Sequence, residues 1–300
     1  MSDSNDGWTY RERIYAAGGT LLAHLVEHHG HSDAATWAQR IADGQVRLDG
    51  AIATAGTRLQ PGQCVEWRRP PWSEPAVPLG FALLALDEDV VAVAKPAGLP
   101  ATPAGGFLRH TLLARVRRRF PEATPMHRLG RGTSGVMLFA RTERARRTLA
   151  ADWRAGAVER SYRALVEGRW ATGETAIDVP IGPVPHPVLG EVWAACATGR
   201  EARTWVRLLA PNASGDASVV AVRLGTGRPH QIRIHLAAAG HPLVGDPLYG
   251  PGGVPRPGGC ALPGDGGYRL HADRIVFPHP ASGARVVVDC APPPVLRGPA

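Results

Sequence analysis

The stretch PMHRLGRGTSGVMLFAR, from Pro125 to Arg141, carries most of the information about the fold of this chain. Its glycines Gly130, Gly132 and Gly135 have the GxGxxG spacing of a phosphate-binding loop. Such a loop follows a strand and opens a helix, so that backbone N–H groups face a pyrophosphate. Here prolines interrupt the residues before the glycines, and the apolar run Val136 to Ala140 predicts a buried strand after them. A nucleotide-dependent oxidoreductase would instead require a helix directly after Gly135.

Composition is that of an ordinary globular protein. A chain of 300 residues suffices for one large or two smaller domains, and 44% hydrophobic with 20% charged residues is typical of water-soluble folds. No apolar run approaches the roughly 18 residues of a membrane span, and the polar start MSDSNDGW lacks the pattern of a secretory signal. We therefore expect a cytoplasmic protein without a membrane partner.

Charge favours a polyanionic partner. The net charge is +8, the pI is about 10.0, and arginine far outnumbers lysine. Guanidinium groups match phosphate geometry and stack on bases, which suits nucleic acid. GC-rich coding raises arginine as well, together with alanine, glycine and proline, so charge alone does not decide. The four cysteines form no CxxC pair and predict neither a disulfide framework nor a thiolate zinc site: Cys64, Cys196, Cys260 and Cys290.

Residues 20 to 67 have the pattern of a small unit. Leucines at helical spacing predict a helix that begins near Leu21, and Ser32 is placed to cap a second helix that ends at Ala42. The sequence VRLDGAIA predicts a β-hairpin around its Asp-Gly turn. A proline-rich segment from Arg68 to Pro78 follows and predicts an extended linker. We therefore expect two domains, residues 1–75 and residues 76–300.

Beyond the linker, short strands alternate with helices. Residues 83–86 and 90–94 predict two strands around an acidic turn. Residues 111–119 and 143–156 predict helices. The alternation of ERSYRALVEG, residues 159–168, predicts a half-buried strand. The second domain is thus expected to mix helices and strands.

The central stretch resembles the HRLDxxTSG signature of the RluA family of RNA pseudouridine synthases, through His127, Arg128, Leu129, Thr133, Ser134 and Gly135. Three further stretches are similar to the family: KPAGLP at 95–100, residues 219–250 and residues 268–283. The resemblance covers about residues 80 to 283. Residues 20–67 also resemble the alpha-L RNA-binding fold that many family members carry at the N-terminus.

This resemblance implies an α+β fold whose core is a bent, mostly antiparallel mixed sheet flanked by helices, with a small N-terminal alpha-L RNA-binding unit. It also implies an isomerase that converts uridine to pseudouridine in tRNA or rRNA. The target base must leave its stack, be cut from the sugar, rotate, and rejoin the sugar through carbon 5. The implied partner is therefore RNA.

The resemblance assigns roles to individual residues. Arg128 is similar to the arginine that fills the place vacated in the RNA, which suits a planar guanidinium. Tyr162 is similar to the tyrosine that packs against the target base and takes part in removing the proton from carbon 5. Arg233 is similar to the arginine that pairs with the catalytic aspartate. Further RNA contacts are expected from the neighbouring motif residues His127, Arg131, Thr133, Arg228, His230 and Gln231.

The family's catalytic aspartate falls on Gly130, which has no side chain. Asp246 and Glu122 are candidates for a substitute carboxylate. An unpaired buried guanidinium is costly, so Arg233 is expected to be solvated, to await an RNA phosphate, or to bind another acceptor such as a carboxylate or a backbone carbonyl. Two interpretations follow: an active synthase that uses another group, or a catalytically silent protein that binds RNA in the same cleft.

No metal and no cofactor are expected. His230, His235 and His241 lie five and six residues apart, which does not match the HExxH motif or close ligand pairs. The implied isomerisation is redox-neutral and needs only side chains. We expect a monomer.

Overall fold

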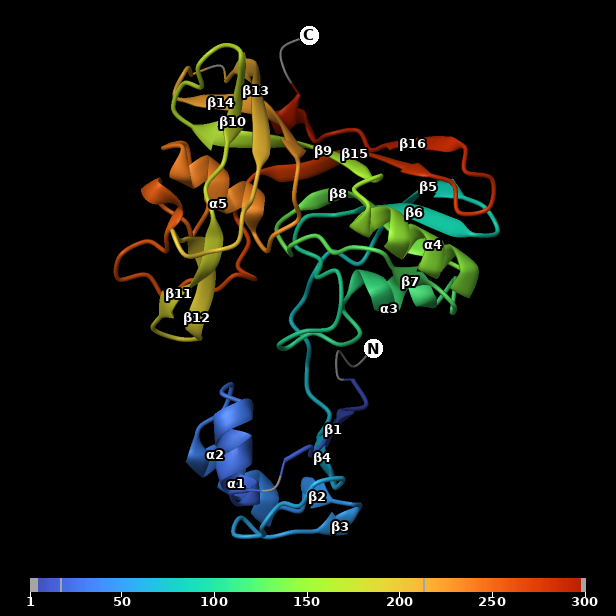
Figure 1. Ribbon diagram of the computed structural model, residues 1–300, viewed down its shortest axis with the longest axis vertical. Coiled ribbons are helices and arrows are strands. Elements are labelled where there is room, and N and C mark those ends of the chain that lie inside the picture. The colour runs from blue at the N-terminus through green and yellow to red at the C-terminus, as the bar shows by residue number, and fades with distance from the viewer. Residues whose placement is uncertain (1–4, 17, 213, 298–300) are drawn as a thin grey trace. The chain divides into compact units, whose positions relative to one another are not determined.

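The computed structural model describes residues 5–16, 18–212 and 214–297. Contacts within the chain divide it into two compact units, Met1–Glu74 and Pro75–Ala300 (Figure 1). The boundary lies within the proline-rich segment. None of the helices in the described part of the chain has the length and hydropathy of a membrane-spanning segment.

The first unit packs two helices against a four-stranded antiparallel sheet of order β1-β4-β2-β3. Leu21, Leu25 and Trp37 belong to its own buried core. The turn between β2 and β3 has positive φ at Asp49 (51°) and Gly50 (80°), as a tight hairpin requires, and the predicted hairpin is confirmed. The elements are β1 (Trp8–Arg13), α1 (Leu21–His28), α2 (Ala34–Ala42), β2 (Val46–Leu48), β3 (Ala51–Ile52) and β4 (Cys64–Arg69).

The cap of α2 was predicted wrongly. Asp33, not Ser32, is the N-cap, and its side chain accepts a hydrogen bond from the backbone N–H of Thr36. The Ser32 hydroxyl instead accepts a hydrogen bond from Arg40 at 2.9 Å. Both residues are good cap formers, and the tertiary contact with Arg40 decides between them.

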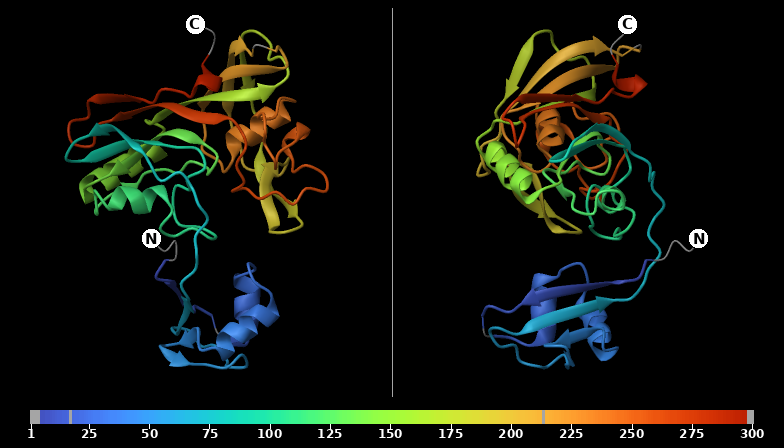
Figure 2. Two further views of the ribbon diagram at one scale, coloured as in Figure 1. Left: turned by 180° about the vertical axis from the view of Figure 1, so that it is seen from behind. Right: turned by 90° about the vertical axis from the view of Figure 1, so that its right-hand side faces the viewer.

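The second unit is built on a ten-stranded sheet in which only the described pair β8 and β15 is parallel (Figures 1 and 2). This confirms the expected mostly antiparallel mixed sheet. Its main path runs through β10 (Glu174–Ile177), β13 (Thr204–Pro211), β14 (Ala217–Leu224), β9 (Glu159–Glu167), β15 (Leu270–Pro278), β8 (Ser134–Ala140), β6 (Val90–Lys95) and β5 (Ala82–Leu86). In addition, β16 (Arg285–Asp289) pairs with β15, and β7 (Thr124–Pro125) pairs with β8.

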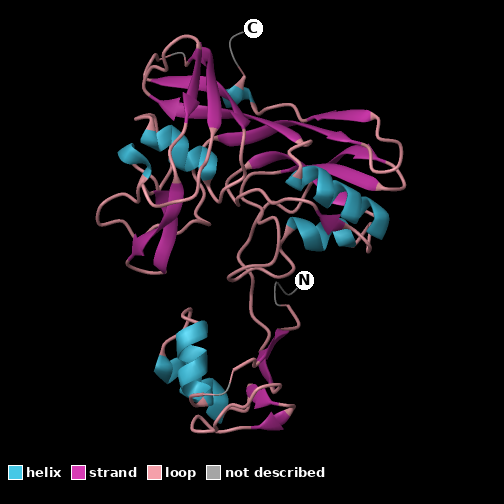
Figure 3. Ribbon diagram, in the orientation of Figure 1, coloured by secondary structure: helices cyan, strands magenta, loops and turns pink. Residues whose placement is uncertain are grey.

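Helices flank this sheet, and a separate two-stranded ribbon completes the unit (Figure 3). The helices α3 and α4 are shorter than predicted. Thr111 is the N-cap of α3 rather than its first residue, and Gly156 at φ 74° terminates α4. The remaining elements are α3 (Leu112–Arg117), α4 (Glu143–Arg154), α5 (Gln231–Ala238), the ribbon β11 (Ile181–His186) with β12 (Gly190–Ala195), and the 3-10 turns η1 (Pro251–Gly253) and η2 (Pro294–Leu296).

The apolar run of β8 is buried on both faces of the sheet. Leu138 belongs to the core cluster that contains Leu149 of α4. Its neighbour Phe139 belongs to the cluster that contains Leu112 of α3. Alternate residues of a strand point to opposite faces, so a strand covered on both sides is apolar without alternation.

A strand, not a helix, follows the three glycines. Gly135 has φ 114° and lies at the start of β8, where an added Cβ would meet the backbone oxygen of Ala272 in β15. This glycine therefore serves the close approach of two parallel strands. A nucleotide-dependent oxidoreductase requires a helix directly after Gly135, but Ser134–Ala140 form the strand β8. The interpretation as such an oxidoreductase is therefore wrong.

Candidate functional site

A cavity of about 890 Å³ opens beside the loop that contains Gly130. Its walls come from the loop before β8, the end of α4, the start of β9, the turn into α5 and the start of β15. Among the described residues that line it, none is Asp or Glu. Five are arginines, which suits a polyanionic ligand: Arg128, Arg154, Arg160, Arg228 and Arg233.

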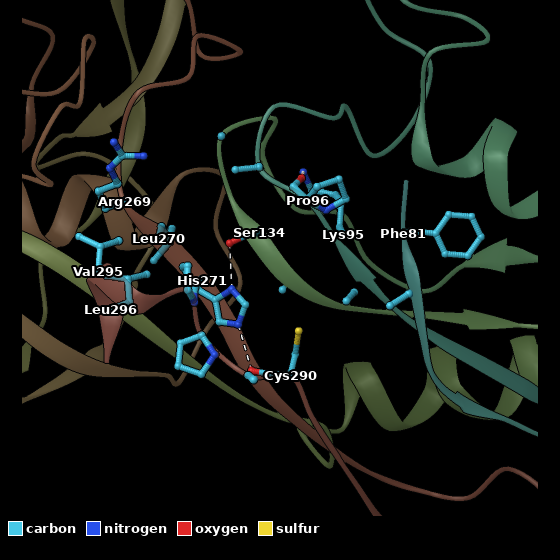
Figure 4. Close-up of a pocket in the computed structure, with 18 of the residues that line it drawn as sticks. Phe81, Lys95, Pro96, Ser134, Arg269, Leu270, His271, Cys290, Val295 and Leu296 are labelled. Atoms are coloured by element: carbon cyan, nitrogen blue, oxygen red, sulfur yellow. Dashed lines mark hydrogen bonds between the residues drawn. The ribbon is translucent and has the colours of Figure 1, made fainter. Parts of the chain in front are cut away.

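A second cavity, of about 600 Å³, has a different character (Figure 4). Its lining is largely apolar, and its polar centre is explained by packing of the sheet. The Ser134 hydroxyl lies 2.8 Å from His271 Nδ1, and Nε2 of the same ring donates to the backbone carbonyl of Cys290. These bonds join β8, β15 and the residue after β16. We therefore take the arginine-lined cavity as the candidate functional site.

Tyr268 fills the space above Gly130. A Cβ added at Gly130 would lie 2.6 Å from the Tyr268 hydroxyl oxygen, and one added at Gly132 would lie 2.8 Å from Cζ of the same ring. Tyr268 is 3% exposed and lines the arginine-lined cavity, and its hydroxyl is 3.3 Å from Thr133 Oγ1. The phenol therefore stands where a side chain at position 130 would begin.

Arg233 has a carboxylate partner, as one of the expected alternatives required. Its Nε and Nη2 donate to the two carboxylate oxygens of Asp246, each at 2.7 Å, and Nη1 donates to the backbone carbonyl of Pro263. The two charged side chains are 3% and 1% exposed. The guanidinium also lies over the Tyr268 ring, 4.3 Å from its centroid. Both ring and ion pair hold the guanidinium in one orientation.

Neither candidate for a substitute carboxylate lines the cavity. Besides the Arg233 bonds, Asp246 accepts hydrogen bonds from the backbone N–H groups of Leu248 and Tyr249, so it is a fully bonded structural group. Glu122 is exposed and pairs with Arg141. The proposal that one of these two acids replaces the missing aspartate is therefore not supported by the geometry.

Tyr162 and Arg160 lie side by side at the start of β9 and both line the cavity. Tyr162 is buried, which raises the pKa of its hydroxyl, while the adjacent guanidinium of Arg160 acts in the opposite direction. The buried Nε of Arg160 has no hydrogen-bond partner in the described part of the chain. Buried donors are nearly always paired, so an unpaired one in a cavity wall is a candidate donor to a bound ligand.

His127 fixes the motif to the sheet. Its Nε2 accepts a hydrogen bond from the backbone N–H of Leu138, and its ring stacks on Trp153 with centroids 5.0 Å apart. Burial lowers the pKa of His127 to about 3, so the ring is a neutral acceptor at physiological pH. His127 lines the cavity, but its Nε2 is engaged by the protein.

The turn into α5 brings three predicted residues to the cavity: Arg228, His230 and Gln231. His230 has φ 55°, a left-handed conformation that is uncommon outside glycine. Its Nδ1 donates to the hydroxyl of Tyr249, because that hydroxyl gives its own proton to the Trp193 carbonyl. Burial lowers the pKa of His230 to about 4. The neutral ring therefore keeps Nε2 as an acceptor.

The amide of Gln231 is fully engaged by the protein. Its oxygen accepts from the Thr226 hydroxyl and the Arg228 backbone, and its nitrogen donates to the Arg203 carbonyl and Thr204. These hydrogen bonds of Gln231 hold the turn that carries Arg228 in one conformation. Among the described residues, the Arg228 side chain makes one hydrogen bond, from Nε to the Glu201 carbonyl, which leaves its terminal nitrogens for the cavity.

Arg131 and Thr133 differ from the other predicted RNA contacts. Arg131 does not line the cavity; its guanidinium lies 3.6 Å from the Asp265 carboxylate. Thr133 lines it but is 4% exposed and faces the Tyr268 hydroxyl. The structure thus gathers Arg128, Gly130, Tyr162 and Arg233 around one space and leaves Arg131 outside.

Possible metal ligands gather elsewhere. Glu12, His24 and His29, in the first unit, offer ligand atoms within 4.8 Å of one another. The carboxylate of Glu12 lies 3.3 Å and 2.8 Å from the two ring nitrogens, as ordinary hydrogen bonds do. His235 and His241 each donate to a backbone carbonyl, of Val179 and Glu167. His235 and His241 are not among the described residues that line the arginine-lined cavity.

Sequence reasoning missed Tyr268, Arg160 and Trp153. A lone tyrosine before a closing strand carries no functional signal. The one available signal was the pair of glycines, Gly130 and Gly132, which together leave room for a large side chain from elsewhere in the fold.

The comparisons with known proteins agree on one family. A family model described as RNA pseudouridylate synthase matches residues 89–238. The "Uncharacterized RNA pseudouridine synthase" of Synechocystis is 40% identical over 281 residues, which cover 93% of this chain and 96% of the relative. "Ribosomal large subunit pseudouridine synthase D" of Xanthomonas campestris is 35% identical over 292 residues, which cover 92% of this chain and 86% of the relative. The solved structure of "Human RNA Pseudouridylate Synthase Domain Containing 1" is 26% identical, with a TM-score of 0.56 over 74% of this chain and 86% of that chain.

Proposed function

Because this chain belongs to the RluA-type family of RNA pseudouridine synthases, we propose that it isomerises uridine in ribosomal or transfer RNA within the arginine-lined cavity. The observation that carries the proposal is the meeting of Arg128, Tyr162 and Arg233 around one cavity of about 890 Å³. That size is within the range of small-molecule sites and admits a single flipped nucleotide.

The arginines supply the binding energy. Contacts from guanidinium groups to phosphates dominate the affinity of proteins for RNA and position the backbone. Arg128 is exposed at the mouth of the cavity, where it fills the place left by the flipped base. The unpartnered Nε of Arg160 is one donor available to the nucleotide inside the cavity.

Tyr162 receives the base. Its buried ring offers a flat surface on which a uracil packs, and stacking of a base on an aromatic ring contributes about 1–3 kcal/mol. Because burial raises the pKa of Tyr162, its hydroxyl is protonated at neutral pH. The Tyr162 hydroxyl therefore relays the proton that is removed from carbon 5. It does not act as an ionised base.

Ribosomal RNA is the first substrate class to test. The relative from Xanthomonas campestris is named for the large ribosomal subunit. The first unit supports binding of a structured RNA, because its strand β1 exposes Trp8 (51%) and Tyr10 (42%) beside Arg11 and Arg13. Trp8 and Tyr10 lie on one face of this strand and Arg11 and Arg13 on the other, so exposed rings are available for stacking on bases and exposed guanidinium groups for phosphate contacts. We propose that this unit is an alpha-L RNA-binding domain and that the protein acts as a monomer.

A second candidate function is RNA binding without catalysis. The observation that favours it is the lack of a carboxylate among the described residues that line the cavity. In that case the same arginines hold an RNA that is released unchanged.

Pseudouridine formation on unmodified transcripts separates the two functions. In vitro transcribed ribosomal and transfer RNAs of the source organism contain no pseudouridine before incubation. We expect the wild-type protein to produce pseudouridine, detected by mass spectrometry, and Tyr162→Phe to produce much less. Binding of the same transcripts without any pseudouridine would favour the silent protein.

A further inference from the structure

We propose that Tyr268 takes the place of the missing aspartate as the residue that reacts with the sugar of the target uridine. This inference rests on the proposed function and names the group that performs its chemical step.

The Tyr268 hydroxyl lies 2.6 Å from where the Cβ of a side chain at position 130 would be, so it occupies the start of the path that an aspartate would take. Gly132 is required for the same reason, because its added Cβ would lie 2.8 Å from the phenol ring. Gly130 and Gly132 thus leave room for the side chain of Tyr268, which lies just before β15.

The surroundings of the Tyr268 hydroxyl also fit this role. The Arg233 guanidinium lies over the Tyr268 ring, 4.3 Å from its centroid, so a fixed positive charge stands beside the phenol. In the part of the chain that the structure describes, the hydroxyl makes one hydrogen bond, to Thr133 at 3.3 Å. Tyr249, whose ring centroid lies 4.9 Å from the same guanidinium, is different: its hydroxyl is bonded to both His230 and Trp193, and it does not line the cavity.

Among the described residues that line the cavity, none is Asp or Glu. Asp246 is fully bonded behind Arg233. Tyrosine is an established nucleophile at the anomeric carbon of sugars in enzymes that lack a carboxylate for this step. Tyr268 is therefore the residue whose place and chemistry fit the vacancy.

The step balances with this residue alone. The phenol oxygen bonds to carbon 1′ of the ribose while the bond from carbon 1′ to N1 breaks, its electron pair goes to N1, and the phenol proton neutralises N1. After the uracil rotates, carbon 5 attacks carbon 1′ and the phenol leaves as phenolate. The phenolate then takes the proton from carbon 5, directly or through the Tyr162 hydroxyl. Pseudouridine and both protonated tyrosines result, with no change in oxidation state.

Tyr268→Phe tests the assignment, because it removes one oxygen and keeps the ring against Arg233. We expect a loss of single-turnover pseudouridine formation on the order of 10²-fold or more, with the RNA dissociation constant unchanged within about twofold. Tyr249→Phe is the matched variant: it removes a buried hydroxyl beside the same guanidinium but outside the cavity. If Tyr268 has only a structural role, Tyr249→Phe should lower the single-turnover rate at least as much as Tyr268→Phe. If Tyr268 reacts with the sugar, Tyr249→Phe should lower that rate far less.

Fluorinated tyrosine at position 268 adds a readout that a structural role does not move. Fluorine withdraws electrons from the phenol oxygen and makes it a weaker nucleophile, so the single-turnover rate should change if this oxygen reacts. A Tyr268→Phe protein within tenfold of the wild-type rate, or a single-turnover rate that fluorination leaves unchanged, would overturn the assignment while leaving the proposed function intact. A wild-type protein that binds the transcripts and forms no pseudouridine would overturn the proposed function and this assignment together.

Discussion

Arg233 and Asp246 form a two-pronged ion pair inside the second unit, with both nitrogen to oxygen distances at 2.7 Å and both side chains almost fully buried. Arg233, which the family resemblance predicted to pair with a catalytic aspartate, binds a structural acid. Because Asp246 also accepts two backbone hydrogen bonds, the pair holds the turn after α5 and fixes the guanidinium against Tyr268.

Removal of the Asp246 charge is expected to destabilise the protein strongly. Asp246→Asn leaves Arg233 buried without its counter-ion, which costs about 3–5 kcal/mol of unfolding free energy. Chemical denaturation monitored by circular dichroism measures this value. The matched control is Asp289→Asn, which breaks the exposed pair with Arg274 and should leave stability unchanged within error. Equal losses in the two variants would contradict the structural role given to Asp246.

An exchange of residues tests how Gly130 and Tyr268 are related. Gly130→Asp alone should destabilise the fold, because the new Cβ would lie 2.6 Å from the Tyr268 hydroxyl oxygen, and Tyr268 is 3% exposed and cannot easily move. Tyr268→Phe removes that oxygen, and the nearest ring atom is then 3.9 Å from the Cβ. The double variant should therefore be more stable than Gly130→Asp.

The same double variant places a carboxylate at position 130, in the cavity that Arg233 also lines. We expect it to recover pseudouridine formation relative to Tyr268→Phe. The measurement is a comparison of thermal midpoints and single-turnover rates across the two single variants and the double variant. Simple additivity of the two stability changes would show that the residues do not contact each other.

Lys95 is expected to titrate near neutral pH. It is the one lysine of the sequence, it is 2% exposed, and burial lowers its pKa to about 7. Its Nζ donates to the backbone carbonyls of Pro96, Leu99 and Arg131, and so ties the loop of Gly130 to β6. These acceptors favour the protonated form and limit the fall in pKa.

The sign of the resulting pH effect follows from proton binding. Lysine in the unfolded chain has a pKa of about 10.4. Between about pH 7 and 10.4 the unfolded state therefore binds more protons at Lys95 than the folded state, and stability from this group rises with pH through that window. With lysine labelled by ¹³C, the single Cε signal should shift with a midpoint near 7 in the folded protein. A midpoint near 10 would contradict the prediction.

Arg128 should matter for catalysis beyond its charge. Arg128→Ala and Arg128→Lys are both expected to lower pseudouridine formation at least tenfold, because the ammonium group of lysine lacks the planar guanidinium needed to stack in the RNA. Arg146→Ala, on the exposed face of α4, removes the same charge away from the cavity and serves as control. Full activity of Arg128→Lys would show that charge alone suffices. The readout is the initial rate on the transcript that the wild type modifies.

Much of the fold was predictable from local patterns. The run Val136–Ala140 is apolar at every position because α3 and α4 cover opposite faces of β8, and the glycine-rich signature gave its position. The cap of α2 was mistaken because the Ser32 hydroxyl bonds Arg40, a contact between side chains that no cap pattern encodes.

The site was predictable only where one motif carried the residue. Arg128, Tyr162 and Arg233 each lie in a recognisable stretch, and the structure brings them to one cavity. Tyr268 reaches Thr133 across 135 positions of sequence through the parallel pairing of β8 with β15. That pairing depends on the whole sheet, so neither the filled space above Gly130 nor the fully bonded state of Asp246 could be read from the sequence.

Pseudouridine formation by the wild-type protein is the most direct test of the proposal that uridine is isomerised in the arginine-lined cavity. Purified protein is incubated with in vitro transcribed ribosomal and transfer RNAs, and the nucleosides are analysed by mass spectrometry after digestion. The account predicts a stoichiometric gain of pseudouridine at a defined uridine with the wild type and a loss on the order of 10²-fold or more with Tyr268→Phe. RNA that is bound by the wild type but contains no pseudouridine after prolonged incubation would contradict it.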